Sequence, residues 1–138
     1  TRHKAGKTLA YHNHHNEFRH YNGDIMLDVI FRETDPEYLK AEIDTHWVQR
    51  GGGNPAEWCR KLKGRLPLIH MKDYKITEEN QIDYAEVGHG NLSWPDIVGA
   101  AGEAGCEWFI VEQDTCPADP FESARMSYEY LTSTLLTA

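Results

Sequence analysis

Short apolar segments of strand length alternate along this chain with segments whose apolar residues follow a helical spacing. The strand-like segments are residues 8–14 (TLAYHNH), 40–45 (KAEIDT), 66–72 (LPLIHMK) and 108–113 (WFIVEQ). Strands that alternate with helices predict βα units and a parallel sheet. The chain holds about four such units, whereas a closed (β/α)8 barrel has eight strands and about 250 residues. The alternation alone leaves two alternatives, half of a barrel or a small open α/β sheet.

Helix starts are marked by a capping residue followed by proline in the first turn. This signal occurs at residues 34–37 (TDPE), 54–57 (NPAE), 93–96 (SWPD) and 119–122 (DPFE), and residues 24–32 have helical spacing as well. In the last helix we expect a buried stripe of Ala124, Tyr128, Leu131 and Leu135. The glycines at 51–53 lack the Lys-Ser/Thr that completes a phosphate-binding P-loop, so we interpret this segment as a flexible loop.

Charge and cysteine content exclude several classes of protein. Lys and Arg number 14 against 22 Asp and Glu, a net charge of -8, which disfavours binding to nucleic acid. No stretch approaches the roughly 18 apolar residues that span a bilayer, and residues 1–7 have no apolar leader segment. The three cysteines form no close CxxC pair, which favours a reducing compartment. We therefore expect a cytoplasmic protein with neither a nucleic-acid partner nor a membrane partner.

Each strand-like segment begins apolar and ends in polar or charged residues. Such groups are costly on a buried strand unless they are paired or bind a metal, and the carboxyl ends of parallel strands are where α/β active sites lie. One candidate from each segment gives His12, Asp44, His70 and Glu112. Two imidazoles and two carboxylates suit one divalent metal, which could be Mn, Co, Mg, Zn or Fe. A single histidine in such a place is more commonly an ordinary polar residue, so the hypothesis depends on all four.

Three longer segments resemble a known family. Residues 9–18 (LAYHNHHNEF), 42–74 and 86–114 are similar to the C-terminal half of sugar phosphate isomerases/epimerases. That group has a xylose isomerase-like TIM barrel and includes inosose dehydratases, ketose 3-epimerases and endonuclease IV. The resemblance implies that residues 1–138 are a single partial domain with the last four βα units of such a barrel.

The resemblance also implies a ligand set, commonly Glu, Asp, His and Glu at the strand ends. Asp44 in the DT motif, His70 in HMKD and Glu112 in VEQD match the last three ligands. His12, in YHNH, stands where the family commonly has its first Glu. Trp47 stands where a substrate-binding histidine often follows the Asp by three residues, so that contact is in doubt here.

The implied activity is a metal-dependent sugar (phosphate) isomerase or epimerase, in which Glu112 removes a proton next to a carbonyl and the metal stabilises an enediolate. Lys72 would polarise an oxygen or act as the acid, or else only form an ion pair. His14, Trp47 and Glu86 are candidate substrate contacts, although packing and loop-ordering roles are the alternatives for Trp47 and Glu86. With a single glutamate, a one-base isomerisation or a dehydration becomes relatively favoured.

Other readings remain open at this point. A nuclease of the endonuclease IV type would need a basic groove, which the acidic balance opposes. A half barrel that only binds a sugar or a partner needs no catalytic metal. In either case a bare half barrel exposes two unpaired strand edges and an apolar interior. We therefore expect self-association or packing against a missing N-terminal half, with a sugar or sugar derivative as the small-molecule ligand.

Overall fold

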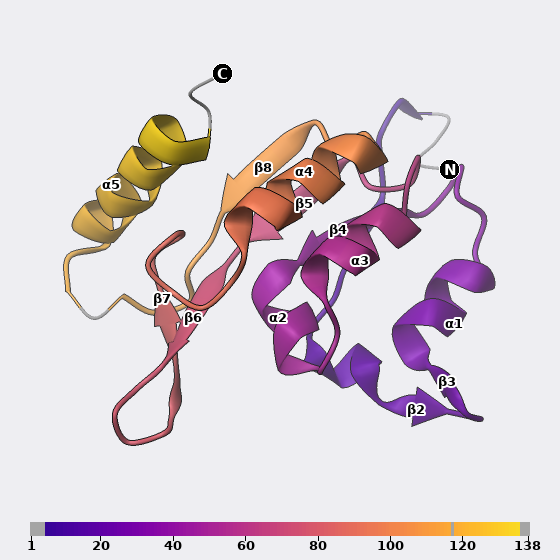
Figure 1. Ribbon diagram of the computed structural model, residues 1–138. Helices are drawn as coiled ribbons and strands as arrows, with labels where there is room; N and C mark the ends of the chain where they lie inside the picture. Colours follow the sequence, from indigo (N-terminus) through magenta and orange to yellow (C-terminus); the bar gives the residue numbers. More distant parts are fainter. Residues whose placement is uncertain (1–4, 117, 136–138) are drawn as a thin grey trace.

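The computed structural model describes residues 5–116 and 118–135. Four parallel strands form the main sheet in the order β1-β4-β5-β8 (Figure 1). They are β1 (Ala10–His12), β4 (Lys40–Asp44), β5 (Leu68–Met71) and β8 (Trp108–Val111). All three strand pairs are parallel, so every strand ends at the same edge of the sheet. The predicted alternation of strands and helices around a parallel sheet is confirmed.

Helices and two small hairpins connect these strands. The helices in the described residues are α1 (Met26–Arg32), α2 (Thr45–Arg50), α3 (Pro55–Lys61), α4 (Trp94–Ala104) and α5 (Pro120–Tyr130), with a 3-10 turn η2 (His15–Phe18) and a π-helical turn η3 (Leu131–Leu135). The hairpins pair β2 (His20–Tyr21) with β3 (Asp24–Ile25), and β6 (Asp73–Ile76) with β7 (Ile82–Ala85). None of these helices has the length and apolarity that crossing a bilayer requires.

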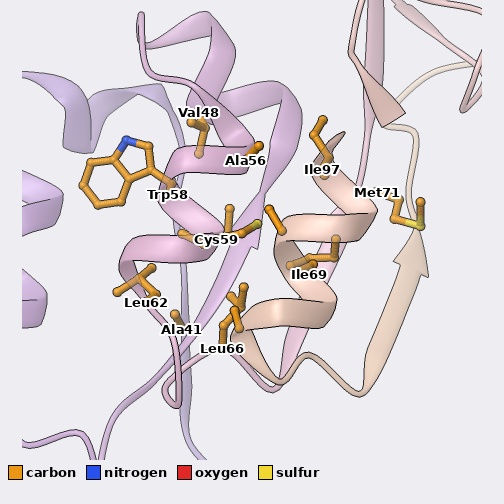
Figure 2. Packing of buried hydrophobic residues seen from close by; sticks show 14 of the residues in the cluster. Ala41, Val48, Ala56, Trp58, Cys59, Leu62, Leu66, Ile69, Met71 and Ile97 are labelled. Carbon is orange, nitrogen blue, oxygen red and sulfur yellow. The ribbon is translucent and has the colours of Figure 1, made fainter. Parts of the chain in front are cut away.

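The hydrophobic core lies between one face of the sheet and helices α3 and α4. Successive residues of a strand point to opposite faces, so Ala41 and Ile43 of β4 share a face with Ile69 and Met71 of β5. All four are almost fully buried. Helices α3 and α4 lie side by side over this face (Figure 1), and Figure 2 shows Cys59 of α3 and Leu62, which directly follows α3, within this cluster.

The opposite face of the same strands is polar toward the carboxyl end. His12 pairs with Glu42 across β1 and β4, and Asp44 pairs with His70 across β4 and β5. Glu112 follows β8 directly, and its backbone N–H donates to the Met71 carbonyl oxygen at 3.2 Å. The period of two in the sequence therefore separates a packed apolar face from a face that carries ionisable groups.

One predicted helix start is wrong. Residues 34–37 do not begin a helix; they form a turn, because β4 starts at Lys40 and leaves no room for helical residues. The carboxylate of Asp35 accepts the Glu37 N–H at 2.8 Å, which stabilises this turn. Residues 45–50 form α2, and the Asp44 carboxylate accepts the Trp47 N–H and caps this helix.

The expected buried stripe of the last helix is wrong at two of its four positions, since Leu131 and Leu135 are partly buried against the core and the other two residues are not. Ala124 and Tyr128 are exposed, whereas Ser123 and Ser127 are the buried residues of the helix. The hydroxyl of Ser127 accepts the Val87 N–H at 3.1 Å, and the Ser123 hydroxyl donates to Glu86 at 2.7 Å. Helix α5 therefore docks onto the segment after β7 through hydrogen bonds, which an apolar periodicity does not reveal.

Strand β8 is an edge strand with apolar residues that stay exposed. Trp108 is 64% exposed, and Phe109, Ile110 and Val111 are exposed as well. An apolar strand at the edge of a sheet, with an unpaired backbone, is a surface prone to strand pairing with further chain.

Candidate metal centre

Four side chains meet where the strands of the main sheet end. His12, Asp44, His70 and Glu112 each offer one ligand atom, and these atoms all lie within 4.8 Å of one another. Asp44 Oδ2 lies 3.2 Å from His12 Nε2 and 3.8 Å from His70 Nδ1. Glu112 Oε2 lies 2.8 Å from His70 Nδ1. The fold therefore brings together the four residues that the sequence pattern singles out.

Asp44 is the fixed point of this group. The residue is fully buried, and its two carboxylate oxygens have different tasks. Oδ1 accepts the Trp47 N–H at 3.1 Å as the cap of α2, which leaves Oδ2 to face the imidazoles. The backbone N–H of Asp44 donates to the side-chain oxygen of buried Asn13 at 3.1 Å, so the ends of β1 and β4 are held together beyond the ladder.

His70 is oriented by a carboxylate from the neighbouring strand. Its Nε2 lies 2.9 Å from Glu42 Oε1, so Glu42 holds this nitrogen and the ring places Nδ1 on the side of Asp44 and Glu112. A carboxylate that holds the outer nitrogen of a histidine is the usual support of a metal-binding imidazole. The hydroxyl of buried Thr45 adds a second support to this segment, since it accepts the Lys72 N–H at 3.0 Å and lies within donating distance of the carbonyl oxygens of Lys72 at 2.8 Å and His70 at 3.1 Å.

The donor atoms fit a bound cation. His70 Nδ1 and Glu112 Oε2 are both buried from solvent and lie 2.8 Å apart, and neither has a hydrogen bond of good geometry, although Lys72 Nζ forms an ion pair with Glu112 Oε2 at 3.1 Å. Buried polar atoms without a partner are rare in folded proteins. A cation that accepts both lone pairs would satisfy them, and two nitrogens with two oxygens form the mixed donor set that Mn, Fe, Co and Zn accept.

The local field at His12 favours positive charge. The hydrogen bond to Asp44 is the main reason that the pKa of His12 lies above its ordinary value; burial opposes this, and the charges of Asp44, Glu42 and Glu112 add to it. The same carboxylates attract any cation. When the His12 imidazole is neutral, they therefore favour a divalent ion at this place.

Lys72 lies beside the four candidate ligands and is only 1% exposed. Its Nζ lies 3.4 Å from Asp44 Oδ2, 3.1 Å from Glu112 Oε2 and 3.0 Å from Asp114 Oδ2. Burial disfavours the charged form, but the attraction of Asp44 and the bonds to Asp114 and Glu112 outweigh it and raise the pKa of Lys72. The side chain is therefore an ammonium ion at neutral pH.

His14 and Trp47 line one side of the centre. The ring of His14 lies 4.9 Å from His12 and 5.2 Å from Trp47, centroid to centroid, and His14 is exposed. Trp47 is buried and carries Lys72 Nζ 5.3 Å from its ring centroid. Both side chains thus adjoin the ligands, where a substrate contact and a packing role are each compatible with the contacts.

Glu86 has a different environment from the other candidates. Its Oε1 accepts the Ser123 hydroxyl at 2.7 Å, and the side chain is only 8% exposed. Burial alone would raise the pKa of Glu86, but the bonds from Ser123, its own backbone and Gln113 lower it. These contacts connect the segment after β7 to α5.

Sequence reasoning missed four residues that shape the site. Glu42, Asn13, Thr45 and Asp114 contact a candidate ligand or Lys72. Glu42 and Asp114 stand two residues from Asp44 and Glu112, so the period of two did place each beside a ligand. The side-chain contacts of Asn13 and Thr45 leave no periodic signal.

Solved structures show the same fold. A sugar phosphate isomerase/epimerase from Parabacteroides distasonis ATCC 8503 superposes with a TM-score of 0.79 and 28% sequence identity, over 99% of this chain and 48% of that chain. A D-tagatose 3-epimerase-like protein shares the fold with a TM-score of 0.63 at 18% identity, over 95% and 49%. The expected xylose isomerase-like TIM-barrel fold is confirmed, of which this chain contributes a parallel α/β part.

Sequence relatives point to the same group. An inosose dehydratase from Geobacillus thermodenitrificans (strain NG80-2) is 27% identical over 148 residues, covering 95% of this chain and 49% of the relative. An inosose dehydratase from Lacticaseibacillus casei is also 27% identical, covering 96% and 49%. The chain thus spans about half the length of the curated relatives it matches. The sequence model of the xylose isomerase-like TIM barrel matches residues 2–134, and the chain belongs to that family.

Proposed function

We propose that this chain carries the metal centre of a divalent-metal-dependent enzyme that acts on a sugar or sugar derivative by removing a proton next to a carbonyl. The observation that carries this proposal is the meeting of four ligand atoms within 4.8 Å, among which His70 Nδ1 is buried and has no hydrogen-bond partner. His12, Asp44, His70 and Glu112 would hold the ion, which is Mn, Co, Mg, Zn or Fe in our proposal. When bound, the cation supplies Lewis-acid polarisation of a substrate oxygen.

Glu112 is the base in this proposal. Its side chain is 33% exposed, whereas Asp44 is fully buried and one of its oxygens accepts the hydrogen bond that caps α2. Glu112 is thus the carboxylate among the four candidate ligands that is open enough to reach a substrate proton. Lys72 keeps its positive charge and would stabilise negative charge that develops on a substrate oxygen.

Dehydration is the second candidate, and two observations favour it. His12 occupies the position of a second carboxylate, so the four candidate ligands offer one exposed base rather than an opposed pair. The curated relatives described above are inosose dehydratases. In a dehydration, Glu112 would take the proton next to the carbonyl, and Lys72 would donate a proton to the hydroxyl that leaves as water.

The test is removal and return of the metal. We expect chelator-treated protein to lose activity toward keto-sugars and inososes, and Mn²⁺ to restore it, because the ligands alone cannot polarise the carbonyl. Product assays separate an isomerised sugar from a dehydrated one, and DNA cleavage serves as the assay for a nuclease. Activity that survives complete removal of metal would contradict the metal mechanism, and absence of bound metal would favour a non-catalytic binding module.

Completion of the barrel is part of the same proposal. Strands β1 and β8 are the two edges of the sheet, and β8 exposes Trp108 and its apolar neighbours. We propose that four further βα units close this sheet, supplied by a second copy or by the half barrel that the relatives have in addition. Light scattering after gel filtration should then show association of this chain at micromolar concentration or with that added half. A stable monomer at every concentration, unaltered by the added half, would contradict this.

A further inference from the structure

Lys72 and the candidate cation compete for the same two oxygen atoms. Nζ of Lys72 lies 3.4 Å from Asp44 Oδ2 and 3.1 Å from Glu112 Oε2. These are the same oxygens that face His12 Nε2 at 3.2 Å and His70 Nδ1 at 2.8 Å. An ammonium ion and a divalent ion repel each other at such short range, so both cannot be held by these oxygens alone.

The surroundings of Lys72 restrict where its ammonium group can go. The side chain is 1% exposed, and Nζ lies 5.3 Å from the ring centroid of Trp47 and 5.7 Å from that of Tyr84. These aromatic rings cover the lysine and separate it from water. The partners open to the ammonium are therefore the carboxylates already in contact with it, rather than solvent.

Asp114 is the carboxylate in contact with Lys72 that lies outside the four candidate ligands. Its Oδ2 is 3.0 Å from Nζ, the shortest of the three lysine contacts. The phenol of Tyr84 hydrogen-bonds to Asp114, and burial together with this bond raises the pKa of Tyr84 to about 12. Tyr84 therefore remains a neutral donor that fixes the Asp114 carboxylate beside Lys72.

We propose that Asp114, held by Tyr84, is a positioning residue that retains the Lys72 ammonium next to the metal centre and so frees the oxygens of Asp44 and Glu112 for the divalent cation. This inference rests on the proposed metal-dependent function and adds a control of metal affinity to it. Without Asp114, Lys72 has only the two ligand oxygens as carboxylate partners, and the ion must displace it.

The experiment is a double-mutant cycle in which the affinity for Mn²⁺ is measured for each variant. Binding is monitored by the decrease of the EPR signal of free Mn²⁺. Mn²⁺ suits a protein with eight histidines, because it binds isolated surface imidazoles less strongly than Zn²⁺. We expect Asp114→Asn to weaken Mn²⁺ binding about 10-fold, the range of an outer support of a metal site. In a Lys72→Met background, Asp114→Asn should change the affinity by less than about 2-fold, because no ammonium is left to compete.

The Lys72→Met background distinguishes positioning of the lysine by Asp114 from a direct effect of the Asp114 charge on the ion. If Asp114 only adds negative charge near the ion, Asp114→Asn weakens binding equally in both backgrounds, and this result would overturn the proposal. Tyr84→Phe is a second variant that keeps every charge: it should weaken Mn²⁺ binding in the native background and leave the Lys72→Met variant unchanged. An equal effect of Tyr84→Phe in both backgrounds also overturns the proposal.

Failure of the proposed function gives a different result. If neither the unaltered protein nor the Lys72→Met variant binds Mn²⁺, both the proposed metal centre and the proposed positioning role of Asp114 are contradicted. If both bind Mn²⁺ and the effects are additive, only the positioning role falls.

Discussion

Replacing Glu112 by Gln should lower turnover by about 10²–10⁴-fold and leave the fold intact, because glutamine has the same size but cannot accept a proton. Glu112 follows β8 outside the hydrophobic core, and its side chain is 33% exposed. Its Oε2 lies 2.8 Å from His70 Nδ1 and 3.1 Å from Lys72 Nζ, so the substitution removes negative charge from the centre of the site.

The same substitution tests two roles of Glu112. A loss of turnover that saturating Mn²⁺ reverses identifies Glu112 as a ligand alone, whereas a loss that persists at saturating Mn²⁺ identifies the base. Glu107→Gln is the matched control, since Glu107 is an exposed glutamate immediately before the same strand. Steady-state kinetics of both variants decide the matter, and a Glu112→Gln variant with native turnover would remove Glu112 from the mechanism.

The four candidate ligands could be predicted because they obey strand geometry. Parallel strands end at a common edge and their side chains alternate, so His12, Asp44, His70 and Glu112 had to share one end of one face. What strand geometry cannot supply is the choice of partner for each side chain. Glu42 holds His70 from within the sheet, a pairing that requires the register Asp44 opposite His70.

The helix predictions failed where tertiary contacts override local sequence signals. The cap and proline at 34–37 are the same signal that correctly predicts α3 and α4, yet β4 begins at Lys40 and the turn cannot extend into a helix. In α5, Ser123 and Ser127 are buried whereas Ala124 and Tyr128 are exposed, because the two serines bond to the segment after β7. Hydrogen bonds of this kind depend on partners that are distant in sequence, so the spacing of apolar residues does not predict them.

Asp73 shows why a polar residue at a strand end need not belong to the candidate metal centre. It follows His70 and Lys72 along the chain, but its carboxylate points to the segment between β7 and α4 and is fully buried. It accepts the backbone N–H groups of Tyr74, Gly88, Gly90 and Leu92 and the indole N–H of Trp94, at 2.7–3.3 Å. A carboxylate with this many donors orders a whole segment, and a side chain at Gly90 would collide with it.

Asp73→Ala should destabilise the protein by about 3–5 kcal/mol, among the largest effects of a single substitution in this chain, because it leaves several donors around a buried position without an acceptor. The indole N–H of Trp94 suffers most, since Trp94 is only 1% exposed and water cannot replace the carboxylate there without opening the core. The segment that carries Glu86 should lose its order at the same time.

Asp83→Ala is the matched control for this substitution. Asp83 is exposed on the same hairpin and accepts the N–H of the next residue, Tyr84, at 2.8 Å, as Asp73 accepts that of Tyr74 at 2.8 Å. The difference between the two variants in urea unfolding therefore isolates the remaining donors of Asp73, and Asp83→Ala should cost less than about 1 kcal/mol. Equal midpoints for the two variants would mean that the segment between β7 and α4 is held by its own turns and by α5, and that the Asp73 carboxylate contributes little to its order.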